Sequence, residues 1–128
     1  MRAAGLIALL ALCACAPQKP APAPAIVLDC KLGFEALSKE ILADPSLTPA
    51  LQEPGEPYRF YRPQGGGPTF AITQAGAPGH PAIFKQEAVR IEGKKAMMTT
   101  GCPFGDPKGY SQVMAYLQGL SAASAPSP

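Results

Sequence analysis

The chain of 128 residues has a formal net charge of +2, which is too small to favour nucleic-acid binding, and its length suits one small domain. Prolines crowd residues 16–25, and serine, alanine and proline dominate residues 121–128. Both compositions disfavour a packed core, so we expect the folded domain to span residues 26–120. The sequence contains no motif typical of a catalytic or cofactor site.

The first 14 residues have the pattern of a secretory signal peptide. Arg2 gives a short positive start, and Ala3 to Leu12 is an uninterrupted run of small and aliphatic residues. The run is too short to cross a bilayer, which needs about 20 apolar residues. A buried N-terminal helix is the alternative, but the proline-rich segment that follows would break it. We therefore predict that residues 1–14 are a signal peptide.

The sequence Leu12-Cys13-Ala14-Cys15 resembles the lipobox of bacterial lipoproteins, in which an aliphatic residue and two small residues precede a cysteine. The resemblance implies cleavage before Cys15, which would carry a diacylglycerol and a third, amide-linked chain as a membrane anchor. Modification of Cys13 is less favoured, because Leu12 would then precede the cut, where a small residue is expected. Ala16 stands where an aspartate retains such proteins at the inner membrane, so the resemblance implies the outer membrane, facing the periplasm.

Residues 15–25 would join the lipidated cysteine to the domain. Their alternation of proline and alanine favours an extended polyproline II spacer of about 3.1 Å per residue, which would reach roughly 30 Å. A ligand for a proline-recognising module is the alternative, but a spacer needs no more than this composition. We expect residues 121–128 to be a disordered tail.

The domain begins with a predicted helix over residues 30–43, with Asp29 as its N-cap. Apolar residues recur there at intervals of three and four residues, which favours one buried stripe formed by Phe34, Leu37 and Ile41. Residues 46–57 contain three prolines, so we expect an ordered loop without regular structure.

Alternating apolar and polar residues predict strands over 58–62 and 69–73, joined by Gly65-Gly66-Gly67. Residues 82–100 resemble a long hairpin. A type II′ turn at Gly93-Lys94 would place Ile91 opposite Ala96, so that apolar pairs share one face. A turn one residue earlier would place Ile91 opposite a lysine, and we prefer the first register.

The last predicted helix spans residues 107–120. Asp106 suits the N-cap, and Pro107 occupies the first helical position, which accepts proline. The resulting order of elements predicts an α+β fold. We expect a two-layer sandwich in which the N-terminal and C-terminal helices cover one face of an antiparallel four-stranded sheet.

Cys30 and Cys102 are the two cysteines that remain after the signal segment. In an oxidising compartment such a pair predicts a disulfide, and here it would join the first helix to the last strand. A reactive thiol or a metal pair is the alternative, but no third cysteine or nearby histidine supports it. We expect no metal and no cofactor.

Two loop features, a lone histidine and a run of glycines, could in principle form a catalytic or ligand-binding site, but the sequence around them favours a simpler interpretation. His80 is the only histidine, and without carboxylates at ligand spacing we expect a solvated loop residue. Gly65-Gly66-Gly67 precedes a proline and a strand, whereas a phosphate-binding loop opens a helix, so we expect a hairpin loop.

The best candidate for a binding surface is the outward face of the predicted sheet. Arginine and tyrosine side chains there would suit sugars, phosphates or an acidic protein. An ordinary solvated strand face is the alternative. The candidate residues are Arg59, Tyr61, Arg90 and Lys95, beside Thr69, Thr73 and Met97.

Together these features favour a lipid-anchored binding or structural module of the bacterial cell envelope, and not an enzyme. Candidate partners beyond the membrane are an envelope protein or a polysaccharide, and no nucleic acid is expected. The alternative function is a small enzyme, or an enzyme accessory, that acts on envelope polymers. Its site would then lie in the loop over residues 45–57 or around His80.

Overall fold

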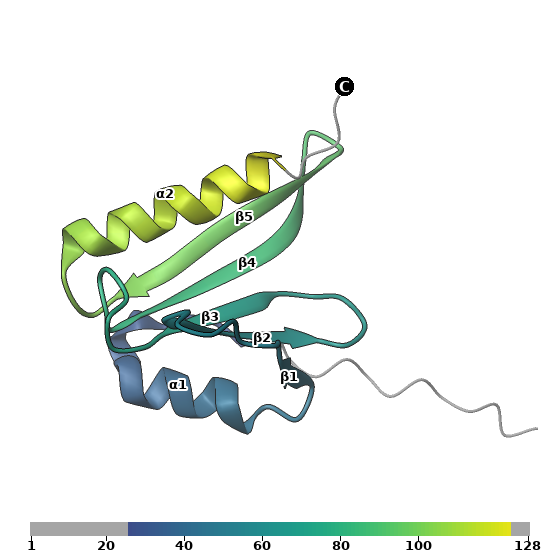
Figure 1. Ribbon diagram of the computed structural model, residues 1–128. Coiled ribbons are helices and arrows are strands. Elements are labelled where there is room, and N and C mark those ends of the chain that lie inside the picture. The colour runs from purple at the N-terminus through teal and green to yellow at the C-terminus, as the bar shows by residue number, and fades with distance from the viewer. Residues whose placement is uncertain (1–25, 124–128) are drawn as a thin grey trace, which may run out of the picture.

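The computed structural model describes residues 26–123, and the fold is α+β. One antiparallel sheet of five strands, ordered β1-β2-β3-β4-β5, forms its centre (Figure 1). Each strand pairs with its neighbour in the sequence, so short connections suffice. In chain order the elements are η1 (Cys30–Leu32), α1 (Phe34–Ala43), β1 (Leu47–Pro49), β2 (Tyr58–Pro63), β3 (Thr69–Thr73), β4 (Ala82–Ile91), β5 (Lys94–Pro103) and α2 (Pro107–Ala123).

The two helices lie on opposite faces of the sheet, so the prediction that both cover one face is wrong (Figure 1). Successive side chains of a strand point to opposite faces, and the middle of this sheet is apolar on both. Phe70 and Ile72 pack with Leu37 of α1, while Ala71 and Phe84 pack with α2. A sheet that is apolar on two faces needs a helix on each, which makes three layers.

The sheet has five strands because the predicted loop over residues 46–57 contains β1. Leu47–Pro49 pairs with the end of β2, and Ala50 N donates a further hydrogen bond of 2.8 Å to Phe60 O. β1 lies at the edge of the sheet, where a proline such as Pro49 is tolerated because its missing N–H removes no bond from a central ladder.

The first helix is divided where the sequence predicted one continuous helix. Asp29 caps a 3₁₀ turn, with Oδ1 accepting a hydrogen bond of 3.0 Å from Lys31 N. Gly33, with φ of 84°, interrupts the helical backbone, and α1 starts at the next residue. Glycine adopts positive φ without the steric cost of a Cβ, so the break falls at this position.

The β4–β5 hairpin turns at Glu92-Gly93, so the preferred register with a turn at Gly93-Lys94 is wrong. Ile91 lies opposite Lys94, and the two turn residues have φ of 50° and 76°, as a type I′ turn requires. Ile91 is 59% exposed, so its pairing with a lysine at the hairpin tip sacrifices little apolar burial.

The predicted disulfide is present. Cys30 and Cys102 are bonded, with Cα atoms 5.3 Å apart, and this bond joins the start of η1 to β5. The Asp106 cap is also confirmed, because Oδ2 accepts a hydrogen bond of 2.7 Å from Gly109 N. α2 continues to Ala123, so the first three residues of the predicted disordered tail are helical.

Several predictions concern residues outside the described part of the chain. The signal peptide, the lipobox with Cys15, the tether and residues 124–128 all lie there. Among residues 26–123, no helix is long and apolar enough to cross a membrane.

Candidate binding groove

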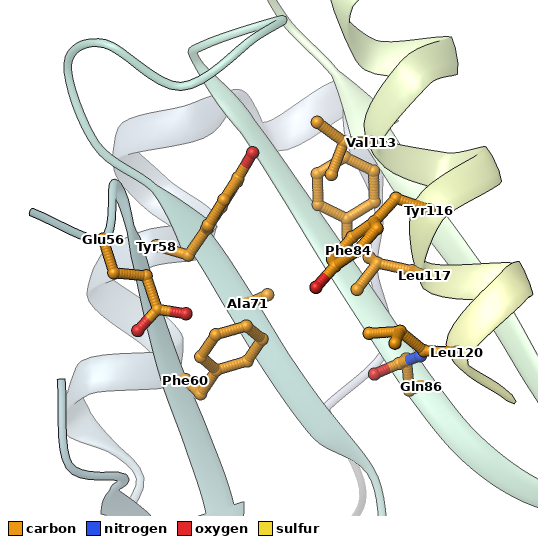
Figure 2. A pocket seen from close by; sticks show the side chains of 10 residues that line it. All are labelled: Glu56, Tyr58, Phe60, Ala71, Phe84, Gln86, Val113, Tyr116, Leu117 and Leu120. Atoms are coloured by element: carbon orange, nitrogen blue, oxygen red, sulfur yellow. The ribbon is translucent and has the colours of Figure 1, made fainter. Parts of the chain in front are cut away.

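A groove of about 580 Å³ lies between α2 and the strands β2 and β3. It exists because α2 packs along β5 and leaves β2 and β3 uncovered on the same face of the sheet (Figure 1). Ten residues line it, with a β2 wall, a floor from β3 and β4, and an α2 wall (Figure 2). They are Glu56, Tyr58, Phe60, Ala71, Phe84, Gln86, Val113, Tyr116, Leu117 and Leu120.

The hollow follows from one small residue between two large ones. Phe60 pairs with Ala71 on β3, and Ala71 pairs with Phe84 on β4, so the three side chains form a row across the sheet. Because the methyl group of Ala71 is short, the two aromatic rings rise on either side of it (Figure 2). Tyr58, two residues before Phe60, extends the β2 wall, and the centroids of these two rings are 6.4 Å apart.

Close packing at the start of α2 holds this helix against β5. Phe84 stacks on Tyr110 with ring centroids 5.0 Å apart and planes 14° apart. Gly101 lies opposite Phe84 on β5 and leaves space for the Tyr110 ring. Gly109 of α2 approaches the Gly79 backbone so closely that a Cβ would clash there. These contacts position the helix that forms one wall of the groove.

The polar residues of the groove lining are few: Glu56 and Tyr58 at the β2 wall, Gln86 on β4 and Tyr116 on α2. Burial raises the pKa of the Tyr58 phenol above its ordinary value, and the nearby Tyr116 and Glu56 add smaller contributions. Glu56 Oε2 accepts a hydrogen bond of 3.3 Å from Glu53 N, which ties its carboxylate to the preceding turn. Gln86 Nε2 donates to Ser121 Oγ at 3.2 Å.

The four residues of the predicted binding surface do not share a face. Arg59 and Tyr61 pair with Ile72 and Phe70, so they lie on the α1 side of the sheet. Arg90 and Lys95 pair with each other near the hairpin tip, and their alternation with Phe84 places them on the α2 side. None of the four lines the groove. Because both faces of the sheet are apolar, the alternation of residues along each strand did not show which face is exposed to solvent.

His80 is half-buried, so the prediction of a solvated histidine is wrong. Its Nδ1 lies 2.9 Å from Oγ1 of Thr73, which is only 2% exposed. The same oxygen accepts a hydrogen bond from Ala82 N at 2.8 Å. These contacts join the end of β3 to the start of β4, and the His80 ring also packs edge-on against Phe34. The cluster therefore stabilises the connection between β3 and β4.

Metal-binding geometry is not found in the described residues, where no three histidine, cysteine, aspartate or glutamate side chains group together. Gly65-Gly66-Gly67 forms part of the connection between β2 and β3, as predicted for a hairpin loop. The chain matches no protein-family model, no curated protein and no solved structure.

Sequence reasoning missed the groove, although it had predicted the helix over residues 107–120 that forms one of its walls. The sequence signal for the β2 wall is the shared alternation of Tyr58 and Phe60. The distance of that wall from α2 depends on glycine contacts between distant segments, and no local pattern reports them.

Proposed function

We propose that the protein is a binding module held at the bacterial cell envelope by a lipid on Cys15, and that the groove is its binding site. The observation that carries this proposal is the groove itself. Its volume of about 580 Å³ falls within the range of about 300–1,000 Å³ typical of ligand pockets, and its lining is mostly aromatic and aliphatic. A few polar groups, Glu56 and the tyrosine hydroxyls among them, would orient the ligand.

The place where the domain begins is compatible with anchoring and binding at the same time. Ile26, the first described residue, packs in the cluster on the α1 side of the sheet. The groove lies on the α2 side. A tether that leaves from the α1 side would hold the domain near a membrane without running through the groove.

The proposal is tested by filling the groove from its floor. Ala71→Leu should lower the affinity for a neutral apolar dye, N-phenyl-1-naphthylamine, by at least about tenfold, because the larger side chain occupies the hollow. Tyr116→Ala, at a residue that is 63% exposed, should weaken binding without disturbing the core. Fluorescence titration of the full chain in lipid nanodiscs measures both, with empty nanodiscs as the blank.

The matched control is Leu51→Ala, which removes the most exposed large apolar side chain of residues 26–123, and this side chain does not line the groove. It should leave dye binding unchanged. If Leu51→Ala lowers the affinity as much as the groove variants do, or if correctly folded groove variants bind normally, the groove is not the binding site.

A further inference from the structure

The groove has one charged side chain, and it is acidic. Among its lining residues, all within the described part of the chain, Glu56 is the one acidic residue, and no lysine or arginine is present. The single salt bridge found in residues 26–123 joins Lys85 to Glu87, so no basic side chain of this region neutralises Glu56 through an ion pair.

Aromatic rings line the groove beside this carboxylate and across from it (Figure 2). Tyr58 and Phe60 follow Glu56 on the β2 wall, with their ring planes tilted by 46°. Tyr116 extends from the opposite wall toward the middle of the groove (Figure 2). The faces of aromatic rings carry negative electrostatic potential and attract cations within about 6 Å of the ring centroid.

Beyond the aromatic end, the groove is aliphatic. Val113 and Leu117 of α2 are almost fully buried and face the sheet over Phe84. A ligand that fills the whole groove therefore meets a carboxylate and two aromatic rings at the β2 wall, and Tyr116 beside the aliphatic Val113 and Leu117 at the α2 wall.

We propose that the groove binds a small amphiphilic organic cation, with its ammonium head next to Glu56 and its apolar body against α2. This inference rests on the proposed function and specifies the class of ligand. The carboxylate and the rings both attract positive charge, and the hydrophobic wall excludes water from the rest of the molecule. An anionic amphiphile of the same shape would place its charge against Glu56 with no basic lining residue to offset the repulsion.

The experiment compares three probes that share a phenyl ring and a short alkyl chain and differ in charge. They are 4-phenylbutylamine, 4-phenylbutan-1-ol and 4-phenylbutyrate. Calorimetric titration of the full chain in lipid nanodiscs at neutral pH should give an affinity for the amine about tenfold higher than for the alcohol. The carboxylate should bind most weakly.

Two variants test the residues. Glu56→Gln should remove most of the preference for the amine over the alcohol, while Glu53→Gln, in the same turn but outside the groove lining, should keep the preference. Tyr116→Leu should weaken amine binding several-fold and leave alcohol binding nearly unchanged, because it removes the ring and retains apolar surface.

Equal binding of the amine and the alcohol to the wild type would overturn the cation proposal and leave the groove as a binding site. An amine preference that persists undiminished in Glu56→Gln would also overturn it. Failure of the proposed function is a separate result, in which the neutral dye binds the Ala71→Leu variant as well as the wild type.

Discussion

Gly101 is a residue at which one added methyl group would disturb the packing of two aromatic rings. A Cβ there would come within 2.7 Å of Tyr110 Oη and 2.8 Å of Ile83 O. We predict that Gly101→Ala lowers the free energy of unfolding by about 1–3 kcal/mol, the usual cost of overpacking. Urea denaturation followed by circular dichroism measures the loss.

Gly65 provides the matched control for this prediction. A Cβ at Gly65 would have no heavy atom within 4 Å beyond its neighbours in the chain, and the residue does not have positive φ. Gly65→Ala should therefore change the free energy of unfolding by no more than about 0.5 kcal/mol. If the two variants lose the same stability, the loss at Gly101 does not come from the aromatic packing.

Tyr110 should make the domain sensitive to alkaline pH. Burial raises the pKa of its phenol above the ordinary value of about 10, so the folded state releases this proton less readily than the unfolded state does. The contribution of Tyr110 to stability is therefore complete below about pH 10 and is lost as the pH rises through the folded pKa. Tyr110→Phe should reduce the fall in melting temperature between pH 9 and pH 11.5.

Thermal melts of both proteins at pH 7 serve as the reference, because neither phenol nor phenyl ring is charged there. A wild type and a Tyr110→Phe variant that lose the same number of degrees at alkaline pH would show that this tyrosine does not carry the effect. Tyr58, whose pKa burial also raises, would contribute in the same direction.

At the scale of elements, local chemistry predicted where helices and strands form, because their signals lie within a few residues. Asp106 followed by a proline marks the start of α2, and this cap is present. β1 was missed because three residues with a proline carry no strand signal. Its pairing depends on the unpaired edge of β2, which is a feature of the assembled sheet.

The placement of elements was harder to predict than their existence. Ala82, Ile83 and Phe84 are all fully buried, so both faces of β4 are covered here and the residue pattern marks neither face as exposed. A run of this kind indicates a sheet covered on both faces, and it was the available sequence signal for helices on opposite sides. The hairpin register was mispredicted because the tip tolerates Ile91 opposite a lysine, while close packing at the other end fixes Phe84 opposite Gly101.

The disulfide joins η1 to β5, and its removal should be costly for so small a domain. Cys30 and Cys102 are 72 residues apart, and the chain-entropy model gives roughly 4 kcal/mol for a loop of this length. We predict that reduction lowers the free energy of unfolding by about this amount, which is a large part of the stability of a typical domain. Urea denaturation with and without dithiothreitol measures the difference.

A variant with Cys30→Ala and Cys102→Ala is the control, since its unfolding should not respond to dithiothreitol. A difference below about 1 kcal/mol between oxidised and reduced wild type would contradict the prediction. It would mean that the cluster of Leu37, Ile41 and Ile83 alone holds η1 and α1 in place.

At the scale of the whole molecule, the candidate site could not be read from the sequence, because it is a gap between elements and not a motif. Phe60, Ala71 and Phe84 are 11 and 13 residues apart and meet only through strand pairing. The opposite wall comes from α2, which the close contact of Gly79 with Gly109 positions. The sequence supplied the apolar residues of both walls but not the distance between them.

The lipid anchor would decide where this groove works, and its test is a single substitution. Leu12, Ala14 and Cys15 have the spacing of a lipobox, so Cys15→Ser should abolish both incorporation of radiolabelled palmitate and retention in the membrane fraction. Cys13→Ser is the matched control, because it removes the neighbouring thiol and leaves the proposed lipidation site intact. Label that persists in Cys15→Ser and disappears in Cys13→Ser would transfer the anchor to Cys13. Label in neither the wild type nor the variants would leave the groove without a membrane anchor.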